Sequence, residues 1–359
     1  MNRVLHIVGK MNRGGQETFI MNLFRSINRE NVMFDFVVST DEKGDYDNEI
    51  CNLGGKIYHV TPKSKNIFRN YKQIKQIVKK NKYYIVERHT SNSYVFIDLF
   101  AAKRGGAKTR IAHSHNTSDN HSFIHRLCQP LLNKYTTARF ACSTEAGEWL
   151  FGKKSFEIIS NAIDIKNYVY SPEIRAKQRK LLDINDNQFV IGTVGRLNKQ
   201  KNPKFILDIF YQIYLKEPNS IFIWIGVGEL EGVIKEKIRS LNLQDHVKML
   251  GLKNNVSELY QAMDAFLLPS LFEGLPVVGI EAQASGLPCF ISDTVTDEIE
   301  VTDLVQFISF DKKATYWAEK VLEAKQVKRK NMLENIKKAN YDINKLAKKI
   351  ESFYLKNKS

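Results

Sequence analysis

Short apolar runs alternate with longer amphipathic stretches along nearly the whole chain. Strands are short, rich in β-branched and aromatic residues, and bounded by turns or helices. By this criterion the sequence predicts strands at 4–9, 34–40, 56–60, 83–89, 109–115, 140–143 and 156–163, and then at 188–195, 220–228, 246–250, 265–269 and 287–292. Because helix-length segments separate these strands, the pattern indicates parallel sheets with helices on both faces.

A polar stretch interrupts the series. Residues 164–187 include SPEIRAKQRK and lie between the two sets of strands. We therefore predict an α/β fold of two facing doubly wound domains, at 1–167 and 168–340, with a ligand cleft between them. Residues 341–359 are predicted to form a C-terminal helix that packs back on the first domain. Ligands of open parallel sheets bind at the carboxyl ends of the strands, so candidate residues are sought there.

Two cations follow the strand predicted at 188–195. Arg196 and Lys201 lie in the loop, and Asn202 with Pro203 forms a suitable N-cap and first residue for the next helix. Cations beside a helix N-terminus favour binding of a diphosphate. Two solvated loop cations are the alternative.

Two carboxylates follow the strand predicted at 265–269. Pro276 suits the first helical position, which leaves the N–H groups of Gly274 and Leu275 able to face an anion. Glu273 precedes this turn, whereas Glu281 lies in the helix among apolar residues. A buried carboxylate is costly unless it is paired or hydrogen-bonded. A ribose diol would satisfy Glu281, and a Lys or Arg partner in the core is the alternative.

The first half of the chain carries glycines and histidines at strand ends. Gly14 and Gly15 follow the first strand and would let a ligand approach the backbone, although an ordinary turn is equally consistent. No G-x-G-x-x-G fingerprint is present. Strand alternation places His113 and His115 on one face, with His115 at the strand's end.

Two patterns were weighed as metal sites. His121 and His125 are four residues apart and, with His113 and His115, suit zinc, but no cysteine or glutamate accompanies them. Asp45-Tyr46-Asp47 resembles a metal-diphosphate element, yet its polar surroundings favour solvated charges. We therefore predict no metal.

The charge of the chain indicates an anionic partner. Lys and Arg number 54 against 39 Asp and Glu, a formal net charge of +15, which suits nucleic acid, an anionic membrane or a phosphorylated substrate. Residues 63–82 hold many lysines and no acid, with apolar residues at helical spacing, and predict a basic amphipathic helix. Docking on an anionic bilayer is one interpretation, and a surface helix with solvated lysines is the other.

The compartment is predicted from what the sequence lacks. No run of eighteen apolar residues occurs, and the N-terminus reads as a strand rather than a signal peptide. The four cysteines form no C-x-x-C pair, which suits a reduced environment. A cytoplasmic protein, peripherally associated with the inner face of the plasma membrane, is the expectation.

Several segments together resemble a known family. GRLNKQKN (195–202), the turn at 226–229, HVKMLG (246–251) and LPSLFEGLPVVGIEAQASGLP (268–288) resemble the C-terminal half of the retaining nucleotide-sugar glycosyltransferases of family 4. The Gly14-Gly15-Gln16-Glu17 loop and the HSHN segment are similar to capsule and exopolysaccharide members. The resemblance covers most of residues 1–295. It implies two facing Rossmann-like domains of GT-B type with the active site in the cleft.

The resemblance also implies roles for the candidate residues. Arg196 and Lys201 would hold the donor diphosphate, and Glu281 the ribose hydroxyls. Glu273 would contact the transferred sugar, with the Gly274 and Leu275 amides nearby. His115 aligns with the active-site histidine near the donor sugar, ahead of His113 as a candidate. Gly14 and Gly15 would line the cleft beside the donor phosphate and the acceptor.

The implied reaction is a retaining transfer without a metal or other cofactor. A hexose or N-acetylhexosamine would move from a nucleotide sugar, UDP-linked, to a lipid-linked saccharide in capsule, exopolysaccharide or O-antigen synthesis. A nucleotide-sugar epimerase of related two-domain fold is the first alternative. A non-catalytic basic protein that binds nucleic acid is the second, and the lack of a recognition helix or an aromatic-and-basic single-strand motif argues against it. The expected partners are therefore a nucleotide sugar, a lipid-linked saccharide and an anionic membrane surface, without nucleic acid.

Overall fold

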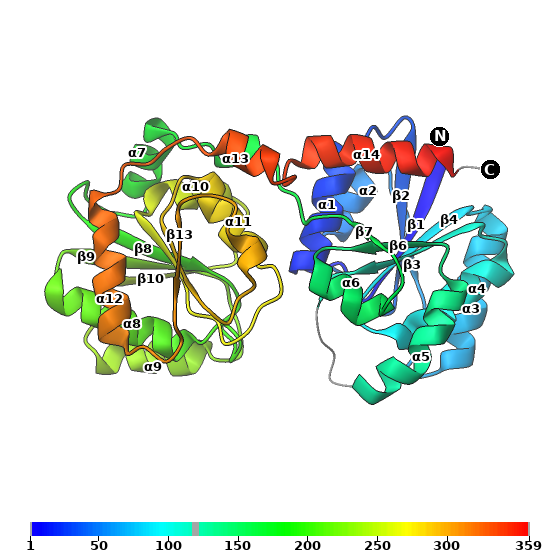
Figure 1. Ribbon diagram of the computed structural model, residues 1–359, viewed down its shortest axis with the longest axis horizontal. Helices are drawn as coiled ribbons and strands as arrows, with labels where there is room; N and C mark the ends of the chain where they lie inside the picture. Colours follow the sequence, from blue (N-terminus) through cyan, green and yellow to red (C-terminus); the bar gives the residue numbers. More distant parts are fainter. Residues whose placement is uncertain (1, 117–121, 358–359) are drawn as a thin grey trace. The chain divides into compact units, whose positions relative to one another are not determined.

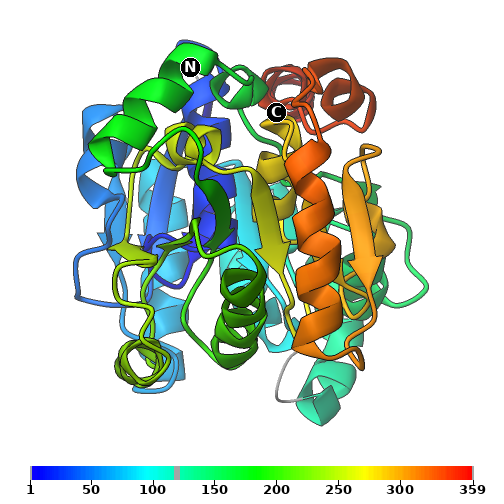
Figure 2. The ribbon, with the colours of Figure 1, turned by 90° about the vertical axis from the view of Figure 1, so that its left-hand side faces the viewer.

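The computed structural model describes residues 2–116 and 122–357, which form two compact units. Unit 1 comprises Met1–Ile163 and Asp342–Ser359, and unit 2 comprises Asp164–Tyr341. Each unit contains one parallel sheet with helices on both faces (Figure 1). Figure 2 shows α12, in orange, lying along the sheet of unit 2.

The sheet of unit 1 has seven strands in the order β3-β2-β1-β4-β5-β6-β7, all paired in parallel. The strands are β1 (Asn2–Val8), β2 (Val32–Val38), β3 (Ile57–His59), β4 (Ile85–Thr90), β5 (Thr109–Ser114), β6 (Ala138–Ala141) and β7 (Glu157–Ile158). The helices are α1 (Gly15–Ser26), α2 (Asp47–Asn52), α3 (Ile67–Asn81), the 3₁₀ turn η1 (Ser93–Val95), α4 (Phe96–Gly105), α5 (Ser122–Tyr135), α6 (Thr144–Phe151) and α14 (Ile343–Lys356).

The sheet of unit 2 has six parallel strands in the order β10-β9-β8-β11-β12-β13. The strands are β8 (Phe189–Val194), β9 (Ser220–Ile225), β10 (Val247–Gly251), β11 (Ala265–Leu268), β12 (Cys289–Ser292) and β13 (Val305–Ile308). The helices are η2 (Ile165–Tyr168), α7 (Pro172–Leu181), α8 (Pro203–Lys216), α9 (Glu231–Ser240), α10 (Val256–Ala262), α11 (Val277–Ala284), η3 (Asp297–Ile299), α12 (Ala314–Glu323), η4 (Ala324–Gln326) and α13 (Leu333–Lys338).

The predicted fold class is confirmed, and each of the twelve predicted strands coincides with an observed one. The edge strand β13 was not predicted. Its four residues, VQFI, form a short apolar run that Gln306 interrupts, and only Ile308 is fully buried. Both sheets reverse their strand order at one point, between β1 and β4 in unit 1 and between β8 and β11 in unit 2.

Strand alternation divides the core of unit 1 between the two faces of its sheet. Val4 and Val8 of β1 pack with α1 and α14, whereas Leu5 and Ile7 pack with α3 and α4. Figure 1 shows α14, in red, lying beside α1, in blue. Its apolar stripe is buried in the core of unit 1 and includes Leu346, Ala347, Ile350 and Tyr354.

The predicted basic helix exists as α3 but is shorter than residues 63–82. Asn66 begins it, because its side chain accepts a hydrogen bond from the Arg69 N–H. Ile74 and Val78 are fully buried, so the apolar stripe packs inside unit 1. Lys63, at the start of the predicted span, precedes α3 and forms an ion pair with buried Asp98. Within the described ranges, no helix has the length and apolar character needed to cross a membrane.

A glycine in unit 2 provides a test of the fold near the end of β9. Gly226 has φ of +137°, and a Cβ there would lie 2.0 Å from the Gly195 carbonyl oxygen. We expect Gly226→Ala to lower the free energy of unfolding by about 2 kcal/mol or more, since both the backbone conformation and the contact are unfavourable. The control is Gly232→Ala in α9, where a Cβ meets nothing within 4 Å. This substitution should raise the free energy of unfolding by roughly 0.5 kcal/mol. Urea denaturation measures the free energy of unfolding of both variants. Equal stability of the two would contradict the backbone conformation and close contact described for Gly226.

Candidate functional site

The candidate residues of unit 2 follow two neighbouring strands. Arg196 and Lys201 lie in the loop after β8, and Glu273 lies in the loop after β11. These strands pair directly at the point where the strand order reverses. Loops after such strands form the ligand-binding crevice in open parallel sheets.

Hydrogen bonds hold these two loops together. The Leu271 N–H donates to the Gln200 carbonyl at 2.8 Å, and the Gln200 side-chain amide donates to the Phe272 carbonyl at 3.0 Å. Asn202 precedes α8 as predicted, but its φ of 54° is left-handed and its side chain does not cap the helix. That side chain donates instead to the Pro269 carbonyl at 3.4 Å. The residue therefore joins the loops rather than capping α8.

Lys201 and Glu273, predicted to serve different parts of a ligand, are in direct contact. Lys201 Nζ forms an ion pair with Glu273 Oε1, and both side chains are largely buried. The Ser270 hydroxyl donates to the same carboxylate oxygen at 3.0 Å. A Cβ at Gly195 would lie 3.0 Å from Lys201 Cε, so glycine leaves room for the lysine stem.

Arg196 has a fixed backbone and an exposed side chain. The neighbouring N–H groups of Gly195 and Leu197 donate to the carbonyls of Ile225 and Val227 at 2.9 and 3.1 Å. Its guanidinium has no hydrogen bond or ion pair to any residue in the described part of the chain. A positive charge is thus held at the mouth of the β8–α8 loop, available to an anion.

The turn after Glu273 differs slightly from the prediction. α11 begins at Val277, so Pro276 is the N-cap rather than the first helical residue. Gly274 and Leu275 are half-buried in the turn before it. The N–H groups in the first turn of a helix have no intrahelical partners, so this end of α11 remains favourable for an anion.

Glu281 is buried, as predicted, and its carboxylate accepts two hydroxyl groups. The Tyr168 hydroxyl donates to Oε1 at 2.9 Å, and the Tyr260 hydroxyl donates to Oε2 at 3.1 Å. The Lys or Arg core partner considered as an alternative is therefore wrong. Burial raises the pKa of Glu281 to about 7, against the opposing effect of the two hydrogen bonds. The tyrosines were missed because they lie far from Glu281 in sequence.

In unit 1 the predicted glycines lie at the start of α1. Gly14 occupies the N-cap position and Gly15 is the first helical residue. A Cβ at Gly15 would meet nothing within 4 Å, so there is open space beside the backbone. This geometry accommodates close approach of a ligand.

His115 follows β5 and lies in a cluster of histidines. Its ring stacks on that of His113 at 4.2 Å, which confirms that the two share a face. His6, Glu87 and His89 join them from β1 and β4. These three were missed, although polar residues at alternate positions of otherwise apolar strands were a usable signal.

The described residues of the two patterns weighed as metal sites have other partners or lie elsewhere in the structure. His121 lies outside the described residues, and His125 uses both ring nitrogens elsewhere, with the Ser93 N–H at 3.1 Å and the Trp149 carbonyl at 2.9 Å. Asp45 is exposed as expected and accepts the Arg13 N–H. Asp47 corrects the prediction of solvated charges, because it is buried in the first turn of α2 and accepts the Gly44 N–H at 2.8 Å.

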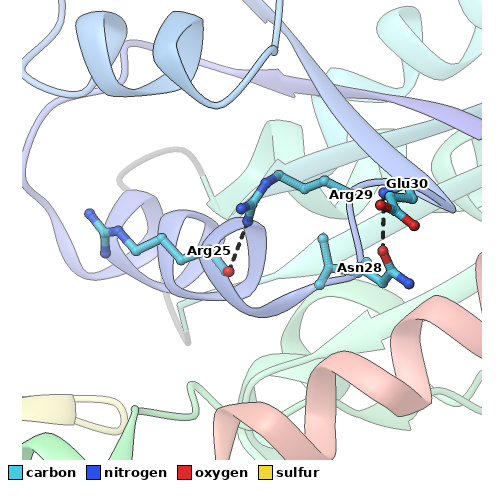
Figure 3. A pocket seen from close by; sticks show the side chains of 5 residues that line it. Arg25, Asn28, Arg29 and Glu30 are labelled. Carbon is cyan, nitrogen blue, oxygen red and sulfur yellow. Dashed lines mark hydrogen bonds between the residues drawn. The ribbon is translucent and has the colours of Figure 1, made fainter.

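A surface hollow lies at the other end of α1 from the glycines. Figure 3 shows it lined by Arg25, Asn28, Arg29 and Glu30, with Arg29 donating to the Arg25 carbonyl. Ile27 completes the lining. It contains none of the predicted site residues and lies near the amino end of β1, since the Asn2 N–H donates to the Asn31 carbonyl.

The buried carboxylate supports a prediction about stability. The pKa of Glu281 lies at about 7 in the folded protein, against an ordinary value of 4.5. The folded protein therefore retains a proton that the unfolded chain loses, and stability falls as pH rises through this window. The free energy of unfolding of Glu281→Gln, relative to that of wild type, should therefore increase by up to about 3 kcal/mol between pH 4.5 and 8.

Denaturant unfolding at pH 5 and pH 8 measures the difference. Glu236→Gln, on the exposed face of α9, is the control and should show no such dependence. A constant difference between wild type and Glu281→Gln at the two pH values would show that the carboxyl is ionised throughout.

Comparison with known protein families accounts for nearly the whole chain. Residues 174–343 match the family described as "Glycosyl transferases group 1", and residues 13–167 match "Glycosyltransferase Family 4". The chain is 34% identical to "Putative glycosyltransferase EpsF" of Bacillus subtilis (strain 168), over 95% of this chain and 93% of that protein.

Two further relatives have more specific names. The "UDP-Gal:alpha-D-GlcNAc-diphosphoundecaprenol alpha-1,3-galactosyltransferase" of Escherichia coli is 28% identical over 78% of this chain and 77% of its own. "Capsular polysaccharide biosynthesis glycosyltransferase CapH" of Staphylococcus aureus is 26% identical over 99% of both chains.

Among solved structures, Anabaena HepE in complex with UDP-glucose superposes with a TM-score of 0.76 and 18% identity, over 97% of this chain and 95% of that one. A glycosyltransferase from Rickettsia africae ESF-5 gives a TM-score of 0.78 at 16% identity, over 99% and 98%. These likenesses show the two-domain GT-B fold. Taken with the family matches and the EpsF relationship, they establish that the chain belongs to the group 1 and family 4 glycosyltransferases.

Proposed function

We propose that the protein transfers a hexose or N-acetylhexosamine from a UDP-linked sugar to a lipid-linked saccharide in capsule or exopolysaccharide synthesis, with retention at the anomeric carbon. The observation that carries the proposal is the contact between Lys201 and Glu273 at the carboxyl ends of β8 and β11, with unpaired Arg196 in the same loop. The names of the Escherichia coli and Staphylococcus aureus relatives and the UDP-glucose complex of HepE support the donor, acceptor and pathway classes.

Arg196 and Lys201 would hold the diphosphate of the donor. As the sugar leaves, negative charge develops on the β-phosphate, and fixed cations stabilise it. Lys201 is neutralised by Glu273 in the free protein. A bound diphosphate offers Lys201 a second anion, which weakens its hold on Glu273 and leaves that carboxylate able to accept sugar hydroxyls.

Glu281 would accept the two ribose hydroxyls. Each oxygen of an ionised carboxylate has room for two hydrogen bonds, and the tyrosines use one on each oxygen. The diol can therefore bind while Tyr168 and Tyr260 keep the carboxylate in place. Because the pKa of Glu281 is about 7, this role favours pH values above neutrality.

The reacting sugar would pass through an oxocarbenium-like state, as in other glycosyl transfers. Retention follows when the acceptor hydroxyl attacks the face that the diphosphate leaves and gives its proton to the departing phosphate. In this scheme Arg196, Lys201 and the first turn of α11 provide the positive potential. We therefore propose that turnover needs no metal, and expect it to continue in the presence of a chelator.

Exposed apolar side chains beside basic residues support docking on a membrane. Phe123, Ile124, Leu127 and Leu131 of α5 all contact solvent, with Phe123 74% exposed. Phe68 at the start of α3 is 78% exposed. α4 packs against both α3 and α5 (Figure 1). We propose that α3 and α5 bind an anionic bilayer, on the cytoplasmic side, where a lipid-linked acceptor is anchored.

The catalytic proposal is tested by assaying transfer from a panel of nucleotide sugars to a diphosphate-lipid saccharide. Arg196→Ala should lower kcat by about a hundredfold, since its charge acts as the phosphate leaves. Glu281→Gln should mainly raise the KM for the donor, because an amide is a poorer acceptor for a diol. Arg239→Ala, an exposed cation of α9, is the control for loss of charge.

Wild-type turnover in both Arg196→Ala and Glu281→Gln would contradict the assignment of these residues to the donor site. Conversion of a nucleotide sugar to its epimer without acceptor would favour the epimerase alternative. Loss of turnover on chelation, restored by zinc, would overturn the metal-free scheme.

The membrane proposal is tested by cosedimentation with vesicles of anionic or neutral lipid. Replacing Lys72, Lys75, Lys79 and Lys80 with glutamate should abolish binding to anionic vesicles, because each lysine near the surface contributes roughly 1 kcal/mol. Leu127→Ser should weaken binding even at high salt, where screening removes the charge contribution. The matched control replaces exposed lysines of unit 2, with the same change in charge: Lys177, Lys180, Lys312 and Lys328. Equal loss of binding in both lysine variants would show that only net charge matters.

A further inference from the structure

Two cations of unit 1 lie where its strand order reverses, and the proposed function does not use them. The reversal is between β1 and β4, and ligands of open parallel sheets bind beside such a point, at the carboxyl ends of the strands. Arg88 lies near the carboxyl end of β4, paired with Ile7 of β1, and Lys63 lies in the loop that follows β3. Both residues are therefore placed where a ligand of unit 1 would bind.

Both cations bind one buried carboxylate. Lys63 Nζ lies 2.5 Å and Arg88 Nε lies 2.8 Å from Oδ2 of Asp98, whose side chain is 1% exposed. One cation is enough to neutralise a buried carboxylate, so the three groups together carry a surplus positive charge. The side chains of Lys63 and Arg88 are 20% and 13% exposed. The surplus charge is thus partly shielded from water but still within reach of a ligand.

The two cations also have unused donors. Arg88 Nη1 donates to the carbonyls of Ile7 and His89 at 2.9 and 2.6 Å, which fixes the guanidinium at the ends of β1 and β4. Its Nη2 has no hydrogen bond to any described residue. The Lys63 ammonium has three donors, and within the described ranges its side chain bonds only to Asp98. An anion with several oxygens would satisfy these donors.

The charge balance of Lys63 points to a second anion. Burial lowers the pKa of the Lys63 amine, an effect that Asp98 opposes and Arg88 reinforces. A like charge nearby and loss of water both disfavour the protonated amine. An anion bound between Lys63 and Arg88 would offset both effects. The alternative is that Lys63 only ties its loop to α4, a role that needs a hydrogen bond to Asp98 but no surplus charge.

The surroundings indicate which anion reaches these residues. α3 begins four residues after Lys63, and Phe68 in its first turn is 78% exposed and belongs to the surface proposed to bind the bilayer. The first turn of α3 has no acidic residue, so its positive end is not compensated there. A diphosphate that joins a saccharide to a lipid lies at the level of the lipid head groups. It would therefore come close to this edge of unit 1.

We propose that Lys63 and Arg88 bind the diphosphate of the lipid-linked acceptor, with Lys63 Nζ and Arg88 Nη2 donating to its oxygens. Charge-assisted hydrogen bonds of this kind are the strong ones. The identity of the anion rests on the proposed function, which assigns the other diphosphate, that of the donor, to Arg196 and Lys201. The surplus charge and the unused donors rest on the geometry alone.

The first test measures transfer to a short-chain diphosphate-lipid saccharide in neutral detergent, where no bilayer is present. Lys63→Met removes the ammonium and keeps the apolar stem, while Arg88 still neutralises Asp98. It should raise the acceptor KM about tenfold or more and leave the donor KM unchanged. With an acceptor that has a neutral linker in place of the diphosphate, wild type and Lys63→Met should have the same KM. Lys65→Met, in the same loop and exposed, is the matched control and should behave as wild type with both acceptors.

Two results of this test would overturn the proposal. An acceptor KM that is unchanged, or that rises equally for the two acceptors, would show that Lys63 does not contact the diphosphate. A rise in the donor KM instead would show that the anion belongs to the donor. If Lys63→Met does not fold, Lys63→Gln takes its place, because its amide can keep the hydrogen bond to Asp98 without the charge.

The second test does not depend on transferase activity. Calorimetry measures binding of farnesyl diphosphate with excess UDP present to occupy the donor site. Wild type and Arg196→Ala should bind with the same Kd, and Lys63→Met at least tenfold more weakly. Binding that depends on Lys63, in a protein without transferase activity, would contradict the proposed function and leave the anion site standing. Transfer with an acceptor KM that is independent of Lys63 would contradict this site alone.

Discussion

The parallel direction of every strand pair in both sheets constrains where chemistry can occur in this protein. Each crossover helix returns the chain to the same edge, so the loops that follow the strands gather there. Lys201 and Glu273 are far apart in sequence, yet they meet because β8 and β11 are neighbours. His6, His89 and His115 meet on the other sheet for the same reason.

Covering both faces of a parallel sheet has a cost for any polar group within it. Water cannot reach the group, so neighbouring side chains must supply its hydrogen bonds. Glu87 and Glu281 are both satisfied partly by tyrosine hydroxyls, which donate without adding a positive charge. The pKa of each carboxyl consequently remains raised by burial. Lys201 and Glu273 are stabilised differently, because their opposite charges neutralise each other in an ion pair.

The sequence predicted the strands well because buried parallel strands are short apolar runs with clear boundaries. Where it overshot, a local feature explains the error: the strand predicted to reach residue 228 ends at Ile225, since left-handed Gly226 begins the turn. β13 was missed because Gln306 interrupts its apolar run of only four residues.

The candidate site shows the same limit. Glu281 stood out in sequence as a carboxylate among apolar residues, but Tyr168 and Tyr260 approach it from separate segments that no spacing connects. Asn202 was correctly placed before α8, whereas its bond to the Pro269 carbonyl depends on the packing of two loops. Asp47 looked solvated because its neighbours in sequence are polar, whereas in the structure it begins α2 and its carboxylate accepts the Gly44 N–H.

The return of α14 to unit 1 has a consequence for the order in which the protein is made. Unit 2 is an insertion between Ile163 and Asp342, where the Ile343 N–H donates to the Ile163 carbonyl at 3.0 Å. Domains tend to fold as they leave the ribosome, N-terminal first. Unit 1 is synthesised first yet lacks its last core helix, and Glu87 lacks the Tyr354 hydroxyl, until all of unit 2 has been translated. Unit 1 is therefore begun first but completed last, when α14 becomes available to cover its core.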